Sequence, residues 1–391
     1  MRQRHDRVKG HAVAAGRCPI LADGSDSVQL GPVTSGLAIA CSIRHTCPVS
    51  GPVNLADVAR LAGVSPATAS RALSDHPHVA EATRARVWAA ARALEYVVSP
   101  EASGLARGRT GRIAVVVPHL ARWWFGAALE GLSEVARAAV TDVLLYRLGD
   151  TESRRAFFDE LPARRRADAV VLLGFGVDER ERGRLDRIGV GIVSAGTRIG
   201  SHPSVSIDEY AAGRQAVDHL LHLGHRRIGM IVTTDPELDP VQPAGRSSAY
   251  RRALADAGVP ADPGLVATVP WSLEGGARAM GELLGLPEPP TAVYAHSDEV
   301  ALGAVGTLRR AGLRVPEDVS VIGIDDHPLA ALTDLSTVAQ PAAEQGAVAA
   351  RSALAGIAGE PVEQAVTVPT RLVIRGSTAP PADRRPARGV S

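Results

Sequence analysis

Residues 53–73 read "VNLADVARLAGVSPATASRAL", a stretch with helical spacing that a glycine and a proline interrupt in its middle. Gly63 suits the left-handed conformation that ends a helix. Ser65 suits a helix N-cap, and Pro66 suits the first position of a new helix, where its missing N–H would have no partner. The stretch therefore predicts two short helices joined by a tight turn, and not one helix with a defect.

Both predicted helices have one apolar face, and a third helix follows them. The first begins after the N-cap Asn54, with Asp57 three residues later. The residues predicted to point inward are Leu55, Val58, Ala59 and Ala62, then Ala69, Ala72 and Leu73, then Val87, Ala91 and Leu94 in a third helix over about 81–94. The outward side of the second helix is small and polar, and consists of Ser65, Pro66, Ala67, Thr68, Ser70 and Arg71.

Two short helices joined by a glycine-containing turn, with a third to close the core, form the helix-turn-helix pattern. Periodicity alone also fits an ordinary three-helix bundle. The outward face of residues 65–71 favours DNA, because a helix that enters the major groove must be narrow, able to donate hydrogen bonds and free of carboxylates. Residues 51–112 hold eight arginines and five acidic residues. This modest excess suits an anionic partner, and a solvated helix face explains it equally well.

The segment "NLADVARLAGVSPATASRALSDHPHVAEATRARVWAAARALEYV", residues 54–97, resembles the DNA-binding headpiece of the LacI/GalR family of bacterial repressors. The resemblance implies a DNA-binding domain over 51–98 in which Pro66, Ala67 and Arg71 read operator bases. It further implies contacts to the DNA from Asn54, Ser65, Thr68, Ser70 and His78, mostly to phosphates. Arg71 is the residue expected to grip a guanine, since its planar fork reaches O6 and N7 together. A phosphate contact is the alternative role for Arg71.

The following segment "VSPEASGLARGRTGR", residues 98–112, is polar and rich in glycine and arginine, which is typical of a linker. The resemblance implies more: a hinge over 99–111 that folds into a short helix on DNA. Leu105 then takes the position that wedges into the minor groove, with Ala102 and Ala106 beside it. Gly104 lowers the helix propensity of this segment by about 1 kcal/mol, so its order should depend on DNA.

From residue 112 onward apolar runs alternate with helical segments. The runs expected to be strands are "RIAVVVP", "DVLLYRL", "ADAVVLLGF", "VGIVSAG", "RRIGMIV", "AVYAHS" and "VSVIGIDD". Such alternation predicts an α/β region with two doubly wound parallel sheets, one over about 112–207 and another over about 208–336. The resemblance implies the periplasmic-binding-protein-like fold over 112–376, in which 340–368 returns to the first lobe and 371–376 completes the second. The tail, 377–391, has no leucine heptads, which predicts a homodimer without a tetramer-forming coiled coil.

Ligands of such folds bind beyond the carboxyl ends of the strands, so the cleft between the lobes is the expected effector site. Ser297, Asp298, Asp325 and Asp326 follow strands there, although Asp298 is better explained as a helix cap. The resemblance implies an effector site composed of Trp123, Trp124, Phe175, Arg246, Trp271, Ser297, Asp325 and Gln340. Trp271 also suits a plain packing role. Gly174 and Gly196 stand where relatives often carry polar residues, which predicts a more apolar or roomier pocket than a typical sugar site.

Composition and motifs restrict the protein class. The 391 residues suit two or three domains, and the 45% apolar content suffices for packed cores. The three cysteines all precede residue 50, which argues against a disulfide framework, and Cys41, His45 and Cys47 lack the second pair that a zinc site needs. Residues 1–50 contain no secretory or membrane segment. They are expected to be a disordered extension, or to precede the true start of translation.

The chain contains no G-x-G-x-x-G after its first strand, no G-x-S-x-G elbow and no P-loop. A protein without enzymatic activity, cofactor or metal is therefore expected. The prediction is a cytoplasmic, sequence-specific transcriptional regulator, most simply a repressor, that binds a pseudo-palindromic operator as a homodimer. A small-molecule effector in the cleft, such as a sugar, would control operator affinity. The alternative is an exported small-molecule binding protein of the same fold.

Overall fold

The computed structural model describes residues 53–74, 76–97, 109–174, 176–235 and 245–382. Its N-terminal part, the headpiece, consists of α1 (Leu55–Ala62), α2 (Pro66–Leu73) and α3 (Glu81–Ala93). Asn54 caps α1 in a reciprocal capping box with Asp57, and Gly63 ends it with a φ of +65°. Ser65 then caps α2. The predicted pair of helices around a tight turn is confirmed.

Small apolar side chains hold the three helices of the headpiece together. The buried residues of its core are Val58, Ala59, Ala62, Ala69, Ala72, Leu73, Val87, Ala90 and Ala91. Most of them are alanines, so the helices approach closely and few large side chains are available to stabilise the fold. The exposed face of α2 is therefore supported by a compact core that lies entirely within residues 55–96.

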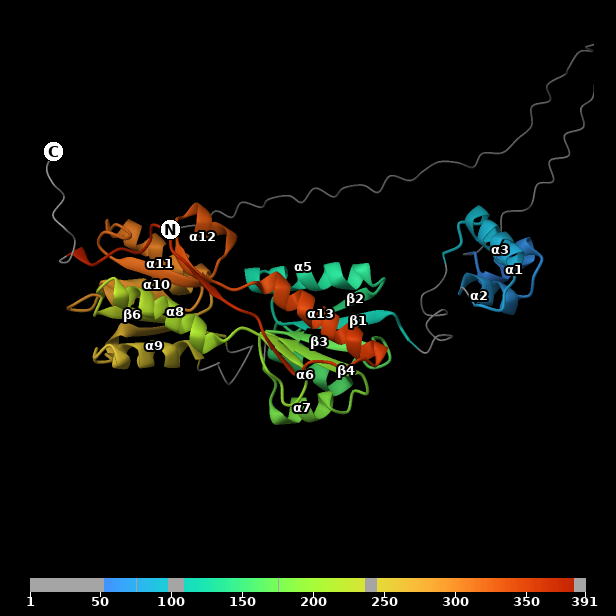
Figure 1. Ribbon diagram of the computed structural model, residues 1–391, viewed down its shortest axis with the longest axis horizontal. Helices are drawn as coiled ribbons and strands as arrows, with labels where there is room; N and C mark the ends of the chain where they lie inside the picture. Colours follow the sequence, from blue (N-terminus) through green and yellow to red (C-terminus); the bar gives the residue numbers. More distant parts are fainter. Residues whose placement is uncertain (1–52, 75, 98–108, 175, 236–244, 383–391) are drawn as a thin grey trace, which may run out of the picture. The chain divides into compact units, whose positions relative to one another are not determined.

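Lobe 1 is a six-stranded, wholly parallel sheet in the order β11-β5-β4-β3-β1-β2. Its strands are β1 (Arg112–Val117), β2 (Asp142–Arg147), β3 (Ala169–Leu173), β4 (Gly191–Ala195), β5 (Ser204–Ser206) and β11 (Ala365–Thr367). In Figure 1, α5 (Trp123–Ala138) and α13 (Ala342–Ala358) cover one face of the sheet, and α6 (Thr151–Glu160) and α7 (Glu179–Leu185) cover the other. The central strands are buried on both faces, as parallel sheets require.

Lobe 2 repeats this plan with the order β12-β10-β9-β8-β6-β7, in which only β12 is antiparallel to its neighbour. Its strands are β6 (Ile228–Thr234), β7 (Val266–Pro270), β8 (Ala292–Ala295), β9 (Ser320–Asp325), β10 (Ser336–Ala339) and β12 (Arg371–Val373). Its helices are α8 (Glu209–His222), α9 (Gly245–Asp256), α10 (Leu273–Leu284), α11 (Asp298–Arg310) and the short α12 (Pro328–Leu332). The predicted fold class, a helical headpiece with two doubly wound lobes, is confirmed.

The chain passes between the two lobes after β5, after β10 and after β11. The elements α7, β5, β7, β10, β11 and α12 were not predicted, because they are short or lack a continuous apolar run, and no helix was assigned to the residues of α13. Residues 377–379, assigned to the tail from the sequence, instead pack on lobe 2. The Ser377 hydroxyl donates to the carbonyl of Val321, and the Ala379 N–H donates to the Ser320 hydroxyl. Within the described residues no helix has both the length and the apolarity to cross a membrane.

Glycines permit close approach of the helix pair that covers one face of lobe 1. A Cβ on Gly131 of α5 would overlap the carbonyl oxygen of Ala343 in α13, and a Cβ on Gly346 of α13 would overlap that of Ala128 in α5. The same reciprocal arrangement joins α10 and α11 in lobe 2, at Gly276 and Gly303. Each lobe therefore contains a helix pair whose backbones are in direct contact.

Candidate functional site

The exposed face of α2 presents the side chains predicted to read DNA. Pro66, Ala67 and Arg71 are exposed, and Arg71 forms no ion pair with any residue that the structure describes. The hydroxyl of Ser65 accepts a hydrogen bond from the Thr68 backbone N–H at 3.1 Å and lies 2.9 Å from the Thr68 hydroxyl. The Arg71 side chain is therefore exposed on this face, whereas the Ser65 hydroxyl is partly engaged within its own helix.

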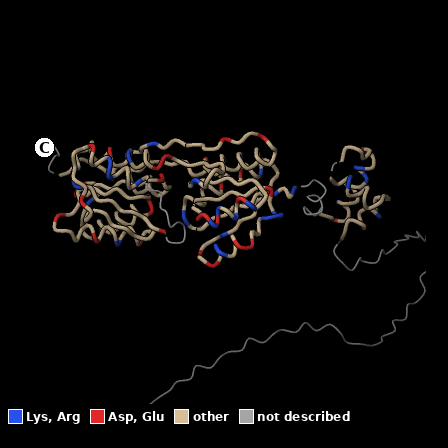
Figure 2. Tube along the Cα trace, turned by 90° about the horizontal axis from the view of Figure 1, so that it is seen from below, with Lys and Arg blue, Asp and Glu red and all other residues tan. Residues whose placement is uncertain are grey.

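Arg71 borders a shallow recess of about 470 Å³ on the headpiece. Thr68, His76, His78, Val79, Ala80 and Thr83 complete its wall. The His78 backbone N–H donates to Nδ1 of His76 at 3.3 Å, so the turn after α2 holds both imidazoles beside the arginine. Charged positions in the headpiece are mainly basic, whereas both signs are interspersed along the lobes (Figure 2). The hinge residues Ala102, Leu105 and Ala106 lie outside the described residues.

A second candidate site is a cavity of about 110 Å³ between the two lobes. Its lobe 1 wall consists of Trp124, Phe125, Gly174, Gly196 and Thr197, and its lobe 2 wall of Glu209, Thr233, Asp235, Arg246, Trp271 and His296. Gln340 and Gln345 enter from the crossing after β10. The cavity lies at the carboxyl ends of the central strands, where ligands of parallel α/β sheets bind.

The indole of Trp124 covers the two glycines of the lobe 1 wall. A Cβ on Gly196 would lie 2.7 Å from Cη2 of Trp124, and one on Gly174 would lie 2.9 Å from its Cζ3. The ring of Phe125 stands edge-on to the indole at 5.2 Å. Of the two expected alternatives, a more apolar pocket and a roomier one, the structure does not show the roomier one, since the indole occupies the volume that the glycines leave free. The expected apolar character is present on this wall.

Gln340 connects the aromatic wall to Asp325. Its Oε1 accepts hydrogen bonds from Nε1 of Trp124 and from Nε2 of Gln345, each at 3.1 Å, and its Nε2 donates to Oδ1 of Asp325 at 2.6 Å. Burial, together with the nearby Asp298 carboxylate, raises the pKa of Asp325 well above its ordinary value. Asp325 has a φ of +140°, a conformation unfavourable for a residue with a side chain. It therefore supports the cavity from behind Gln340 and is not part of the cavity wall.

Arg246 is 8% exposed and forms a buried ion pair with Glu209. Its Nε and Nη2 donate to the Glu209 carboxylate, and its Nη1 donates to the backbone carbonyl of His296. Burial lowers the pKa of the guanidinium, but the Glu209 carboxylate outweighs this effect and raises it. Arg246 is thus a fixed cation in the lobe 2 wall. Its side-chain partners are the Glu209 carboxylate and the carbonyl of His296.

Asp235 joins the two lobes across the cavity. This lobe 2 carboxylate forms an ion pair with Arg122 of lobe 1 and lies 2.8 Å from Nε2 of His119, also of lobe 1. Burial raises the pKa of Asp235, but the bonds to His119 and Arg122 dominate and lower it. The Arg122 guanidinium also lies 5.4 Å from the ring of Trp271. A charged bridge therefore holds the two lobes together beside the ligand cavity.

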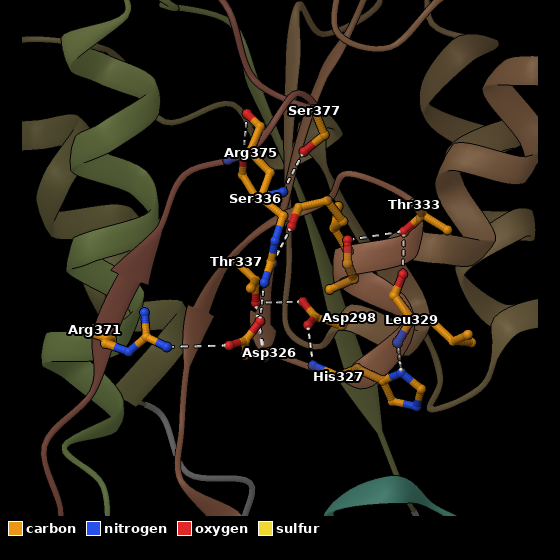
Figure 3. A network of polar contacts seen from close by, with 12 residues as sticks. Asp298, Asp326, His327, Leu329, Thr333, Ser336, Thr337, Arg371, Arg375 and Ser377 are labelled. Carbon is orange, nitrogen blue, oxygen red and sulfur yellow. Dashed lines mark hydrogen bonds and ion pairs between the residues drawn. The ribbon is translucent and has the colours of Figure 1, made fainter.

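A polar network behind the lobe 2 wall explains the acidic residues that follow β8 and β9 (Figure 3). Asp298 is fully buried, and its carboxylate accepts hydrogen bonds from the Thr337 hydroxyl at 2.7 Å and the His327 backbone N–H at 2.9 Å. Burial raises its pKa to about 6. Asp326 forms ion pairs with Arg371 and Arg375, at 3.7 and 2.6 Å. These residues fix the chain between the lobes.

The cap assignment at the start of α11 was wrong by one residue. Ser297 is the N-cap, and its hydroxyl accepts from the Val300 N–H at 3.4 Å, whereas Asp298 occupies the first helical position and faces inward. The buried Ser297 does not line the cavity. Trp123 does not line it either, because its ring lies 5.6 Å from that of His327, beside a separate recess that includes Asp325.

The structure thus brings together four of the predicted effector residues: Trp124, Arg246, Trp271 and Gln340. Phe175 lies outside the described residues. Sequence reasoning missed Glu209, Asp235, His296 and Gln345. Asp235 and His296 directly follow β6 and β8, so the strand-end rule that selected Ser297 could have found both. Glu209 and Gln345 lie in the first turns of helices and carry no comparable signal.

The buried imidazole of His296 predicts a pH-dependent stability. Burial, and secondarily the charge of Arg246, lowers its pKa to about 3. This pKa in the folded state lies below the ordinary value of 6.5. Between these two pH values His296 is therefore protonated in the unfolded state and neutral in the folded state. Stability is therefore lost as pH falls from 6.5 towards 3, by up to about 1.4 kcal/mol per pH unit. In urea denaturation between pH 6.5 and 4.5, His296→Gln should show a flatter pH dependence than the unaltered protein. Parallel curves for the two proteins would contradict a neutral His296.

Comparisons with known proteins agree with the fold of the headpiece and of the lobes. Residues 54–99 match the description "Bacterial regulatory proteins, lacI family", and residues 217–378 match "Periplasmic binding protein-like domain". The HTH-type transcriptional repressor CytR of Escherichia coli is 36% identical over 329 residues, which cover 82% of this chain and 95% of that protein. The HTH-type transcriptional regulator GalS of Salmonella typhimurium is 33% identical over 311 residues, which cover 78% of this chain and 91% of that protein.

Solved structures show the same similarity. A complex of the transcriptional regulator CelR with cellobiose has a TM-score of 0.62 and 32% identity, covering 83% of this chain and 99% of that one. The lac repressor dimer bound to operator and the anti-inducer ONPF has a TM-score of 0.75 and 25% identity, covering 84% of this chain and 100% of that one. The headpiece, the two lobes and the extent of these similarities lead to one conclusion: the chain belongs to the lacI family of bacterial regulatory proteins and is a DNA-binding transcriptional regulator.

Proposed function

We propose that this regulator is a repressor whose operator affinity is set by a small-molecule effector bound between the lobes. The observation that carries the proposal is the cavity itself, because its wall combines residues of both lobes. A ligand that contacts both walls binds the closed arrangement better than an open one and therefore shifts the balance between them. A sugar or a related metabolite suits the wall, which joins aromatic faces to a few fixed polar groups. The cellobiose complex of CelR supports this class of effector.

We further propose that the protein acts as a homodimer in the cytoplasm, without catalytic activity. Two copies related by a two-fold axis suit a pseudo-palindromic operator, as in the lac repressor dimer on its operator. The role of Leu105, with Ala102 and Ala106, as a minor-groove wedge belongs to this proposal. An effector that distinguishes the two arrangements by about 1–3 kcal/mol changes operator affinity about 5–150-fold, and the operator changes effector affinity by the same factor.

A genome-wide binding map of the full chain tests the proposal. Fragments bound by the protein should share a pseudo-palindromic motif with half-sites about one helical turn apart. Genes beside these sites then indicate which metabolites to test for release of the protein from its operator. Enrichment of genomic DNA without a common motif would contradict a sequence-specific repressor. A motif whose binding no metabolite of those genes affects would contradict effector control.

Arg71→Ala tests the base-reading role of α2. Because Arg71 is exposed and unpaired among the described residues, its loss should weaken operator binding by about 1–3 kcal/mol and relax the preference at one base pair. Footprinting and titrations on operator variants with that base pair changed measure both effects. Arg92→Ala, at an exposed position of α3 outside the recess, serves as the matched control. If Arg71 contacts a phosphate instead, binding to all sequences weakens equally and the dependence of log affinity on log salt decreases by about 1.

A further inference from the structure

Gln345 carries an oxygen that no residue of the described chain satisfies. The side chain is fully buried in the first turn of α13 and lines the interlobe cavity. Its Nε2 donates to Gln340, whereas its Oε1 accepts no hydrogen bond within the described residues. A buried acceptor without a donor is unfavourable and uncommon in folded proteins. Its position in a cavity wall suggests that the donor comes from a ligand.

The neighbouring residues determine which end of the Gln345 amide is left without a partner. The indole Nε1 of Trp124 can only donate, so the atom of Gln340 that it contacts must be the oxygen. The same oxygen contacts Gln345 at 3.1 Å. Two oxygens without a proton between them repel, and the Gln345 atom at this contact must therefore be its nitrogen. The Oε1 of Gln345 is then the end of the amide that remains unpaired, independently of how the amide was first oriented.

Several other polar groups of the cavity are already occupied. Trp124 Nε1 and both polar atoms of Gln340 take part in a series of hydrogen bonds that ends at Asp325. On the opposite wall Arg246 is paired with Glu209, and Asp235 is paired with Arg122. The remaining residues of the lobe 1 wall are aromatic or glycine, namely Trp124, Phe125, Gly174 and Gly196, except for Thr197. A ligand on this wall meets flat apolar surface, the Thr197 side chain and the unsatisfied oxygen of Gln345.

We infer that Gln345 Oε1 is a specificity-determining acceptor that recognises an N–H or O–H group on a ring of the effector. The ring packs against Trp124 and Phe125, and its donor group points at Gln345. Both a sugar hydroxyl and the N–H of a nitrogenous ring provide this chemistry, whereas a ring bearing only methyl groups does not. The inference rests on the proposed function for its biological meaning, but the recognition itself concerns the cavity alone.

Small ring compounds test the inference directly, because a cavity near 110 Å³ is comparable to the cavity of about 150 Å³ that holds benzene in another protein. Phenol presents an O–H, aniline an N–H, and toluene is a similar ring without a donor. Isothermal titration calorimetry of the full chain measures each dissociation constant for the unaltered protein, Gln345→Met and Gln345→Glu. Ribose and cellobiose, titrated in the same way, show whether sugar hydroxyls are accepted at this position.

Gln345→Met removes both polar atoms, so its preference for phenol and aniline over toluene should fall about 3–10-fold, the effect of one hydrogen bond. Gln345→Glu keeps an acceptor oxygen, and its buried carboxyl, when protonated, can still donate to Gln340 Oε1, so this variant should retain the preference. An unchanged preference in Gln345→Met overturns the inference. So does an equal loss in both variants, which would mean that Gln345 acts only by holding Gln340.

Two further measurements keep the inference testable if no probe binds. The ligand-free Gln345→Met variant should unfold about 2–4 °C higher than the unaltered protein, since an unsatisfied acceptor has been removed. A midpoint that is unchanged or lower means that the oxygen has a partner, and overturns the inference. Operator affinity is measured with and without each bound probe. If Gln345 distinguishes the probes but no bound compound changes the operator affinity, the proposed function is contradicted. The inference about Gln345 is not affected by that result.

Discussion

Replacing Gly346 by alanine is expected to lower the free energy of unfolding by about 3 kcal/mol, because the added methyl group has no room. It would overlap the carbonyl oxygen of Ala128 in the facing helix α5. A backbone oxygen cannot rotate away as a flexible side chain can, so α5 and α13 must separate. The reciprocal contact at Gly131 is then lost as well. Denaturant-induced unfolding of the full chain measures the effect.

Gly356, in the same helix, provides the matched control. A Cβ there makes an ordinary contact of 3.7 Å with the Val362 side chain. Gly356→Ala is expected to stabilise the protein by about 0.5–1 kcal/mol, since glycine in a helix interior is less favourable than alanine. If both variants change the stability in the same direction, direct contact between the two backbones is not what distinguishes Gly346.

Arg246→Met is expected to lower the free energy of unfolding by about 3 kcal/mol, since it leaves the Glu209 carboxylate without its partner. The effect stays at the lower end of the range for buried ion pairs because the Glu209 side chain is 22% exposed and keeps some hydration. The carbonyl of His296 also loses its donor. The variant should bind ring probes or metabolites in the cavity more weakly than the unaltered protein. Chemical denaturation and calorimetry measure the two effects.

Glu209→Gln separates the charge effect from the loss of packing. Glu209→Gln alone leaves the buried guanidinium with a neutral partner, and the double variant Arg246→Met/Glu209→Gln leaves no buried charge. The double variant should be more stable than Arg246→Met, with a coupling energy of about 1–3 kcal/mol in the double-mutant cycle. Additive effects of the two substitutions would show that the ion pair does not stabilise the cavity wall.

The headpiece could be predicted almost completely from the sequence, because its determinants are local. Asn54, Gly63, Ser65 and Pro66 set the helix ends through contacts within three or four residues along the chain. The same local rules fail where two neighbouring polar residues compete. At the start of α11 both Ser297 and Asp298 suit an N-cap. The choice between them depends on Thr337 and His327, which are distant in sequence and claim the Asp298 carboxylate.

The position of the cavity could be predicted from the sequence, but the hydrogen-bond and ion-pair partners of its residues could not. The strand-end rule pointed to this edge of the sheets, and the resemblance to the LacI/GalR family pointed to Trp124, Trp271 and Arg246. The partners of these groups come from the opposite lobe or from another helix, so they depend on how the lobes close. The Asp235 bridge to Arg122 is such a contact. A polar residue in a buried helix turn, such as Gln345, has no sequence signal at all, because its neighbours along the chain are ordinary helix formers.

The close packing of α5 against α13 in lobe 1 has a consequence for movements that begin at the cavity. The helix α5 begins at Trp123, beside the cavity, and ends at Ala138. Shortly after it, the N–H of Asp142 donates to the carbonyl of Gly111, just before β1, on the side of the lobe from which the chain leads back to the headpiece. A helix of 16 residues is about 24 Å long. A rotation of about 5° at one end of such a rigid body displaces the other end by about 2 Å, the size of the helix shifts that accompany many allosteric transitions. Because their backbones are in direct contact, α5 and α13 are expected to move as one body, and a change at Trp124 or Gln345 would then shift Gly111 and the start of β1.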